Sequence, residues 1–96
     1  MATGYRVTLK PSALKELDHL PDEPREETVA RIAELRENPR PPDALLLDLY
    51  TQHYRLCVFR SLYRLIYMVS DKQRRVVVLR IRLRRDVYKG MRGPEG

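Results

Sequence analysis

The apolar residues of this chain change their spacing about halfway along the sequence. Before Asn38-Pro39 they recur at helical intervals, in two segments that Pro21 separates. From Tyr54 onward they form runs rich in Val, Ile, Leu and Tyr, which favour β-strands. Helical spacing followed by strand-like runs predicts an α+β fold, in which helices pack on a sheet.

Two helices are predicted in the N-terminal half. Pro11 or Ser12 can open the first helix, and Pro21 ends it. Acidic residues from Asp22 onward suit the first turn of the second helix, where the helix dipole favours negative charge. The residues at helical spacing, which we expect in the core, are Ala13, Leu14, Leu17 and Leu20, then Val29, Ile32, Ala33 and Leu35.

Five strands are predicted around these helices. Tyr5–Leu9 alternates large and polar residues and precedes the first helix. The other four are expected at Ala44–Leu49, Tyr54–Phe59, Leu62–Val69 and Arg75–Leu83, with a closing turn or short helix at Arg84–Lys89. The predicted fold is therefore β-α-α-β-β-β-β, with two N-terminal helices packed on one antiparallel sheet.

The composition fits one small domain over residues 1–96, with a flexible tail at Gly90–Gly96. Hydrophobic residues are 43% and charged residues 33%, enough for a single core and too apolar for a disordered chain. Leu56–Val69 contains two arginines and is too short to cross a bilayer, so no membrane partner is expected. The single Cys57 cannot form an internal disulfide, and the N-terminus lacks a signal-peptide pattern. Both features predict a cytoplasmic protein.

Glycine is absent between Gly4 and Gly90. Walker and Rossmann phosphate-binding loops need glycine where the backbone approaches phosphate, so both are excluded. His19, His53 and Cys57 are scattered and do not form a zinc-binding pattern. The sequence therefore predicts no cofactor and no metal site.

The net charge of +6 is unevenly distributed along the chain. Residues 1–48 hold 7 basic and 10 acidic residues, whereas residues 49–96 hold 12 basic and 3 acidic ones. Ten of those 12 are arginines, whose planar guanidinium suits phosphates and stacks on bases. Such a basic half is either a solvated surface or the contact for a polyanion, most simply a nucleic acid.

Arginines from neighbouring strands are predicted on one face of the sheet, because side chains alternate along a strand. This face is either solvated or a site for a phosphodiester. Its expected members are Arg55 beside Cys57, Arg64 beside Ile66 and Met68, and Arg80, Arg82 and Arg84, whereas Leu79, Ile81 and Leu83 are expected on the opposite face.

Metal-free RNA cleavage needs a deprotonated 2′-hydroxyl, a neutralised phosphorane and a protonated leaving oxygen. Arginine suits the second task, but it stays protonated and is a poor base. Tyrosine can transfer a proton if neighbouring arginines lower its pKa. Histidine titrates near neutrality, but His53 stands just before its strand.

Several short motifs occur in a particular order and spacing along the chain. They are Ala13-Leu14-Lys15-Glu16-Leu17 with Leu20-Pro21, then Ile32–Leu35 with Asn38-Pro39, Tyr54-Arg55-Leu56, Leu62-Tyr63-Arg64-Leu65-Ile66-Tyr67, and Arg84-Arg85-Asp86-Val87-Tyr88. Taken together they resemble the RelE/ParE superfamily of bacterial type II toxins. The resemblance spans Tyr5 to Lys89 and implies a RelE-like fold with a neutralising antitoxin. RelE-like members cleave mRNA in the ribosomal A site without metal, whereas ParE-like members poison DNA gyrase.

The resemblance implies roles for particular residues of this chain. Arg64 matches the arginine proposed to stabilise the phosphorane, and Arg55 falls at a position that is often basic. Arg84 matches the closing arginine, and Tyr88 matches a tyrosine implicated in catalysis or stacking. Further contacts with RNA are expected from Arg60, Arg80, Arg82 and Arg85.

Two departures from the family pattern leave three functions open. Cys57 stands where some RelE-like enzymes have a second lysine, and Leu83 where many members have a histidine. The retained arginines favour a ribosome-dependent mRNA endoribonuclease. The missing lysine and histidine favour a gyrase inhibitor of the ParE type, or an attenuated toxin that acts mainly as antitoxin partner and co-repressor. The expected partners are a cognate antitoxin, the ribosome and mRNA, and operator DNA for the toxin–antitoxin complex.

Overall fold

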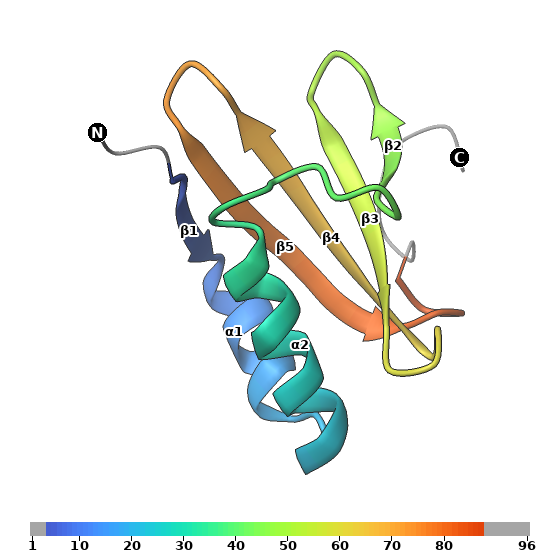
Figure 1. The fold of residues 1–96 in the computed structure, drawn as a ribbon. Helices are drawn as coiled ribbons and strands as arrows, with labels where there is room; N and C mark the ends of the chain where they lie inside the picture. Colours follow the sequence, from blue (N-terminus) through green and yellow to red (C-terminus); the bar gives the residue numbers. More distant parts are fainter. Residues whose placement is uncertain (1–3, 88–96) are drawn as a thin grey trace.

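The computed structural model describes residues 4–87, in which two helices cover one face of a five-stranded sheet (Figure 1). The chain then forms turns over residues 84–87, and the rest of the predicted closing element and the tail Gly90–Gly96 lie outside the described residues. Neither helix in residues 4–87 has the length and apolar character needed to span a membrane. The order confirms the predicted arrangement: β1 (Arg6–Leu9), α1 (Pro11–Asp18), α2 (Asp22–Glu34), β2 (Leu45–Asp48), β3 (His53–Val58), β4 (Tyr63–Ser70) and β5 (Arg75–Leu83).

The sheet is mixed rather than purely antiparallel. Its strand order is β1-β5-β4-β3-β2, and strands β2 to β5 pair antiparallel as predicted. At the other edge β1 runs parallel to β5, with Val7 opposite Val76. The expectation of an antiparallel sheet is therefore wrong at this edge. Alternation within each strand carries no information on the relative direction of two strands that lie far apart in the chain.

The helix ends follow local chemistry. α1 begins at Pro11, whose missing N–H is not needed in the first turn. α2 begins directly after Pro21 and carries Asp22 and Glu23 in its first turn. α2 ends at Glu34, and the N–H groups of residues 35–38 form turn hydrogen bonds to the carbonyls of residues 31–34.

The hydrophobic core lies between the helices and the sheet. Three residues of the predicted apolar stripes are exposed instead: Leu14 is 50% exposed, Val29 is 49% exposed, and Ala33 is exposed as well. On α2 the inward position falls at Thr28, whose Oγ1 donates a hydrogen bond to the Pro24 carbonyl at 2.7 Å. A search for apolar residues at helical spacing does not include threonine. Thr28 can nevertheless be buried, because its hydroxyl forms a hydrogen bond within its own helix. The principal buried members are Ala13, Leu17, Leu20, Ile32, Leu35, Tyr54, Leu56, Leu65, Tyr67, Val69, Val76, Val78 and Ile81.

A β-bulge in β5 changes which of its residues face the core. Ile66 of β4 lies opposite Arg80 but Tyr67 lies opposite Val78, so Leu79 has no paired residue. Strict alternation predicts Leu79 on the core face, yet the buried core residues here are Val78 and Ile81, and Leu79 is only partly buried. The bulge thus corrects the prediction for Leu79 and leaves Arg80 opposite Ile66.

Candidate active site

The arginines of β3, β4 and β5 lie on the sheet face opposite the helices. Cys57, Arg64 and Arg82 form one row across these three strands. Arg55, Ile66 and Arg80 form the next row. Cross-strand partners share a face, and the residues between them in sequence, such as Leu56 and Leu65, belong to the helix-covered core. The structure brings together Arg55, Arg64, Arg80 and Arg82, a surface we call the arginine face.

Arg82 is held by α1. Its Nε donates to Glu16 Oε2 at 2.5 Å, and Glu16 Oε1 accepts the Ile81 backbone N–H at 2.9 Å. The Arg82 side chain is 33% exposed and that of Glu16 is 22% exposed, so solvent screens this pair only partly. Arg82 therefore ties the end of β5 to the helix layer.

Arg80 is also engaged within the fold. Its Nη1 donates to the Val87 carbonyl at 2.9 Å, and Val87 itself is fully buried. Burial lowers the pKa of Arg80, and the positive charge of Arg82 lowers it further, whereas Glu16 raises it. Arg80 holds the segment after β5 against the sheet.

Arg55 occupies the middle of the face. It is partly buried and lies between Leu45 of β2 and Ile66 of β4. Its Nε atom is buried without a hydrogen-bond partner in the part of the chain that the structure describes. A buried donor without an acceptor is costly, and a guanidinium in that state favours an anionic ligand.

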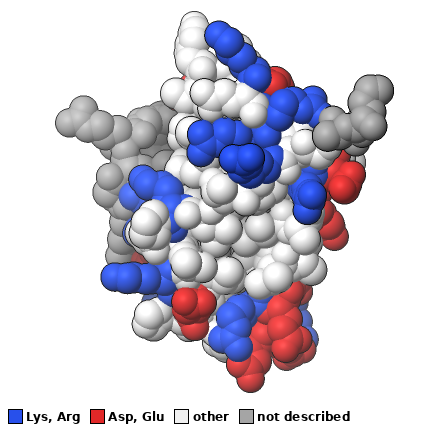
Figure 2. Space-filling model, turned by 90° about the vertical axis from the view of Figure 1, so that its left-hand side faces the viewer, with Lys and Arg blue, Asp and Glu red and all other residues white. Residues whose placement is uncertain are grey.

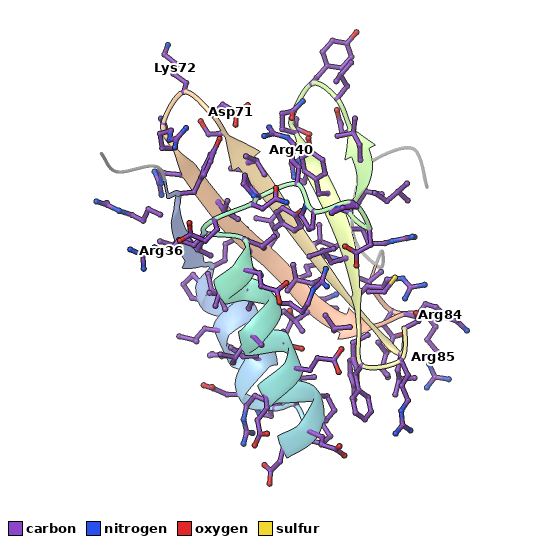
Figure 3. The ribbon with its side chains drawn as sticks, in the orientation of Figure 1. Arg36, Arg40, Asp71, Lys72, Arg84 and Arg85 are labelled. Atoms are coloured by element: carbon purple, nitrogen blue, oxygen red, sulfur yellow. The ribbon has the colours of Figure 1, made fainter. Side chains whose placement is uncertain are left out.

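Arg64 also belongs to a second group of arginines, which lies at the β3–β4 turn. Arg64 Nη1 donates to the Ser61 carbonyl of this turn at 2.8 Å. The Arg84 N–H donates to the Leu62 carbonyl at 2.9 Å, which brings the segment after β5 beside the turn. Figure 3 shows Arg84 and Arg85 at this end of the sheet. We call Arg60, Arg64, Arg84 and Arg85 the turn cluster.

A shallow pocket opens beside the turn cluster. Leu62, Leu83, Arg84 and Arg85 line it. Leu62 is 48% exposed, so the pocket combines an apolar surface with two guanidinium groups. This combination suits a nucleotide, whose base is apolar on its faces and whose phosphate is anionic.

The turn itself has an unusual backbone. Phe59, Arg60 and Ser61 have φ angles of 51°, 57° and 64°, so three successive non-glycine residues are left-handed. Each such residue is strained, because its Cβ approaches the following carbonyl oxygen. The Phe59 N–H donates to Glu27 Oε2 of α2 at 2.6 Å. The sequence predicts a tight link here but contains no signal for its conformation or for the contact with Glu27.

The turn cluster has no acidic partner in the described residues. Among residues 4–87, none of the ion pairs involves Arg55, Arg60, Arg64, Arg84 or Arg85. The view from the β1 edge, which does not single out these arginines, shows several basic side chains over the upper half of the molecule and acidic side chains at its lower end and along one side (Figure 2). Within residues 4–87, no acidic side chain therefore neutralises these five arginines in an ion pair.

Within residues 4–87, few groups on the arginine face could transfer a proton. Cys57 lies opposite Arg64, whereas His53 stands at the other end of β3 with its Nδ1 2.6 Å from Thr51 Oγ1. The predicted catalytic Tyr88 lies outside the described residues. Residues 4–87 contain no group of three or more His, Cys, Asp or Glu residues placed to hold a metal ion.

Residues 7–88 match the family described as the ParE toxin of the type II toxin–antitoxin system parDE. The sequence has no match among curated proteins. Comparison of the fold with solved structures gives matches to toxins of toxin–antitoxin systems as well.

The fold is similar to those of solved RelE toxins. The intact E. coli RelBE toxin–antitoxin complex contains a chain with 29% identity and a TM-score of 0.72, covering 82% of this chain and 95% of that one. The RelE–RelB complex of Pyrococcus horikoshii OT3 gives 26% identity and a TM-score of 0.73, covering 88% and 97%. The isolated E. coli RelE toxin gives 30% identity and a TM-score of 0.71, covering 82% and 83%.

Proposed function

Because the chain belongs to the RelE/ParE superfamily of toxins from type II toxin–antitoxin systems, we propose that it is a ribosome-dependent mRNA endoribonuclease that inhibits translation. The observation that carries this proposal is that, within residues 4–87, neither Arg55 nor any arginine of the turn cluster forms an ion pair. Five arginines without acidic partners in the described residues suit a chain of phosphates better than a neutral or cationic ligand.

In the proposed mechanism the arginines stabilise the transition state. As the 2′-oxygen attacks, negative charge accumulates on the non-bridging oxygens of the phosphorane. Arg64 donates to these oxygens with the N–H groups that Ser61 does not use, and Arg55 and Arg84 supply further positive charge. Arg60 and Arg85 bind neighbouring phosphates, whereas Arg80 and Arg82 support the face through their contacts with Val87 and Glu16.

Proton transfer is assigned to Tyr88, whose position follows Val87 directly in the sequence. A cluster of guanidinium groups lowers the pKa of a nearby tyrosine hydroxyl, so that its phenolate can accept the 2′-proton and then return it to the leaving 5′-oxygen. Cys57 and Leu83 stand where other members have a lysine and a histidine, so the chain lacks those two groups at these positions. We therefore expect slow turnover.

A cognate antitoxin is the proposed partner. The similar chains of E. coli and Pyrococcus horikoshii OT3 were solved as RelBE and RelE–RelB complexes. The basic half of this chain favours an acidic, amphipathic antitoxin segment, and the resulting complex is proposed to bind operator DNA. Since the proposed substrate is mRNA on ribosomes, the protein is proposed to act in the cytoplasm.

Primer extension on a defined mRNA in purified translating ribosomes tests the enzyme activity. The parent and Arg75→Ala, which removes an exposed arginine at the far end of β5, are expected to cut in the A site. Arg64→Ala is expected to reduce cutting by about 100-fold or more. Circular dichroism of each variant checks folding. Intact mRNA with folded parent protein contradicts the proposed function, whereas full activity of Arg64→Ala contradicts the role assigned to Arg64.

A second candidate is inhibition of DNA gyrase. It is favoured by the scarcity of proton-transfer groups on the arginine face, where Cys57 lies opposite Arg64, and by the matched family of ParE toxins. A supercoiling assay with purified gyrase separates the two candidates. Inhibition of supercoiling at a stoichiometric amount of toxin, together with intact mRNA, supports gyrase as the target. Unimpaired supercoiling at excess toxin contradicts the gyrase candidate.

A further inference from the structure

We propose that Glu27 on α2 is a positioning residue for Arg64, acting through the left-handed β3–β4 turn. The proposal rests on the endoribonuclease function proposed above, because it assigns a role to Arg64 in that reaction. Glu27 lies on the helix layer and does not belong to the arginine face, so its effect must be transmitted through the turn.

The first step is the contact between helix and turn. Glu27 is exposed and its Oε2 lies 2.6 Å from the Phe59 backbone nitrogen, a charge-assisted hydrogen bond that crosses from α2 to the end of β3. Phe59 is the first of the three left-handed residues. The carboxylate therefore holds the turn at the point where its backbone leaves the strand.

The second step is the conformation of the turn. Strained left-handed residues persist only where their surroundings enforce them, and they concentrate at functional sites. In this turn the Leu62 N–H donates to the Phe59 carbonyl at 3.0 Å, which closes the turn on itself. The contact with Glu27 adds the external restraint, since three such residues in succession are unfavourable without glycine.

The third step leads to the guanidinium. The carbonyl of Ser61, the last left-handed residue, accepts the hydrogen bond from Arg64 Nη1 at 2.8 Å. When the Ser61 carbonyl is held in place, the hydrogen bond holds one edge of the Arg64 guanidinium. The orientation of its other N–H groups is then set as well. The stabilisation of the transition state depends strongly on this orientation, because a donor that is displaced from the developing negative charge loses most of its effect.

Ribosome cleavage kinetics test this role with matched variants. Glu27→Ala is expected to lower kcat about tenfold with KM within twofold. Glu27→Gln keeps an oxygen acceptor for the Phe59 N–H and should retain most of the activity. Glu26→Ala, which removes the adjacent exposed carboxylate of α2, should behave as the parent. Equal loss in Glu27→Gln and Glu27→Ala, or normal kcat in Glu27→Ala, overturns the proposal.

A double variant separates positioning from a general structural effect. In the Arg64→Ala background Glu27→Ala should add no further loss of kcat, because the residue through which it acts is gone. A further tenfold loss in that background shows that Glu27 does not act through Arg64 and overturns the proposal.

Nuclear magnetic resonance distinguishes failure of this proposal from failure of the proposed function. Glu27→Ala should accelerate hydrogen exchange of the Phe59 amide and shift the Arg64 guanidinium signals, whereas Glu26→Ala should change neither. If the folded parent protein leaves mRNA intact, the proposed function is wrong, and these signals still report whether Glu27 positions Arg64. Unchanged Arg64 signals in Glu27→Ala overturn the positioning role whatever the activity.

Discussion

The guanidinium of Arg40 forms a two-pronged ion pair with the carboxylate of Asp71, with Nη1–Oδ1 and Nη2–Oδ2 distances both of 3.0 Å. Arg40 Nε also donates to Tyr54 Oη at 2.5 Å, and its Nη2 donates to Gln52 Oε1 at 3.0 Å. One side chain thereby joins the connector after α2 to the β2–β3 and β4–β5 turns. Figure 3 shows Arg40 and Asp71 at the end of the sheet opposite Arg84 and Arg85.

Arg40→Ala should destabilise the fold without touching the arginine face. Tyr54 and Gln52 would lose a charged partner, and hydrogen bonds to charged groups contribute about 1.5–3 kcal/mol, so we expect a loss of about 2 kcal/mol in the free energy of unfolding. Urea denaturation measures this loss. Arg36→Ala, which removes an exposed arginine just after α2, should change it by less than about 0.5 kcal/mol. Equal values for the two variants would refute the structural role of Arg40.

Asp71 should make stability fall at acidic pH. The hydrogen bonds from Arg40, and then from Tyr5, hold the pKa of this carboxyl below its usual value of 3.8. The unfolded chain therefore binds a proton at a higher pH than the folded one, so the contribution is complete above about pH 4 and is lost as pH falls through the folded pKa.

Urea denaturation of the parent and Asp71→Asn between pH 2 and about 6 checks this sign. The variant should be less stable at pH 6 and should lose less stability on acidification. Arg40→Ala should flatten the same pH dependence, because the principal cause of the shift is removed. A slope that is steeper in Asp71→Asn than in the parent would show that the sign is wrong.

Ser61→Gly should stabilise the protein. Ser61 has a φ of 64°, a conformation that costs a non-glycine residue about 1–2 kcal/mol, and glycine adopts it freely at an entropic cost of about 0.5–1 kcal/mol. We expect a net gain of about 0.5 kcal/mol in the free energy of unfolding, measured by urea denaturation. Ser12→Gly in the first turn of α1 serves as the control and should destabilise. Destabilisation by both substitutions would contradict the argument.

Glu16→Ala should cost about 2 kcal/mol of stability, because it leaves the Ile81 N–H and Arg82 Nε without their acceptor. Glu16→Gln should cost less, since its amide oxygen can still accept from Ile81. Thermal or urea denaturation measures both, with Glu23→Ala at an exposed position of α2 as the control. A loss no larger than that of Glu23→Ala would argue against the clamp between α1 and β5.

Arg85→Ala and Arg82→Ala should differ in the salt dependence of RNA binding. Arg85 belongs to the turn cluster without an ion pair in residues 4–87, so its removal should lower the slope of log K against log salt by about 0.7 for single-stranded RNA. Arg82 is committed to Glu16, so Arg82→Ala should lower stability and leave that slope nearly unchanged. Fluorescence titration with a labelled oligonucleotide at several salt concentrations measures both slopes, and the reverse pattern would contradict the assignment.

Much of the site could be predicted from alternation alone. Arg55 and Arg64 lie on the face expected for them, because β3 and β4 keep a regular register through these positions. The bulge at Leu79 could not be foreseen, since it depends on how β5 fits against β4. The same limit applies to Arg82, whose ion pair with Glu16, a residue 66 positions away, no local pattern indicates.

The order of elements and the basic character of the sheet were determined by the sequence itself. Both depend on the spacing of apolar residues and on the residue composition within single segments of the chain. Proline and charge placed the helices near Pro11 and Asp22, and β-branched runs placed the strands. Tertiary structure alone decided that β1 runs parallel to β5 and that Glu27 reaches Phe59, 32 residues away. These contacts join segments distant in the chain, and their energies depend on register and packing that no local pattern encodes.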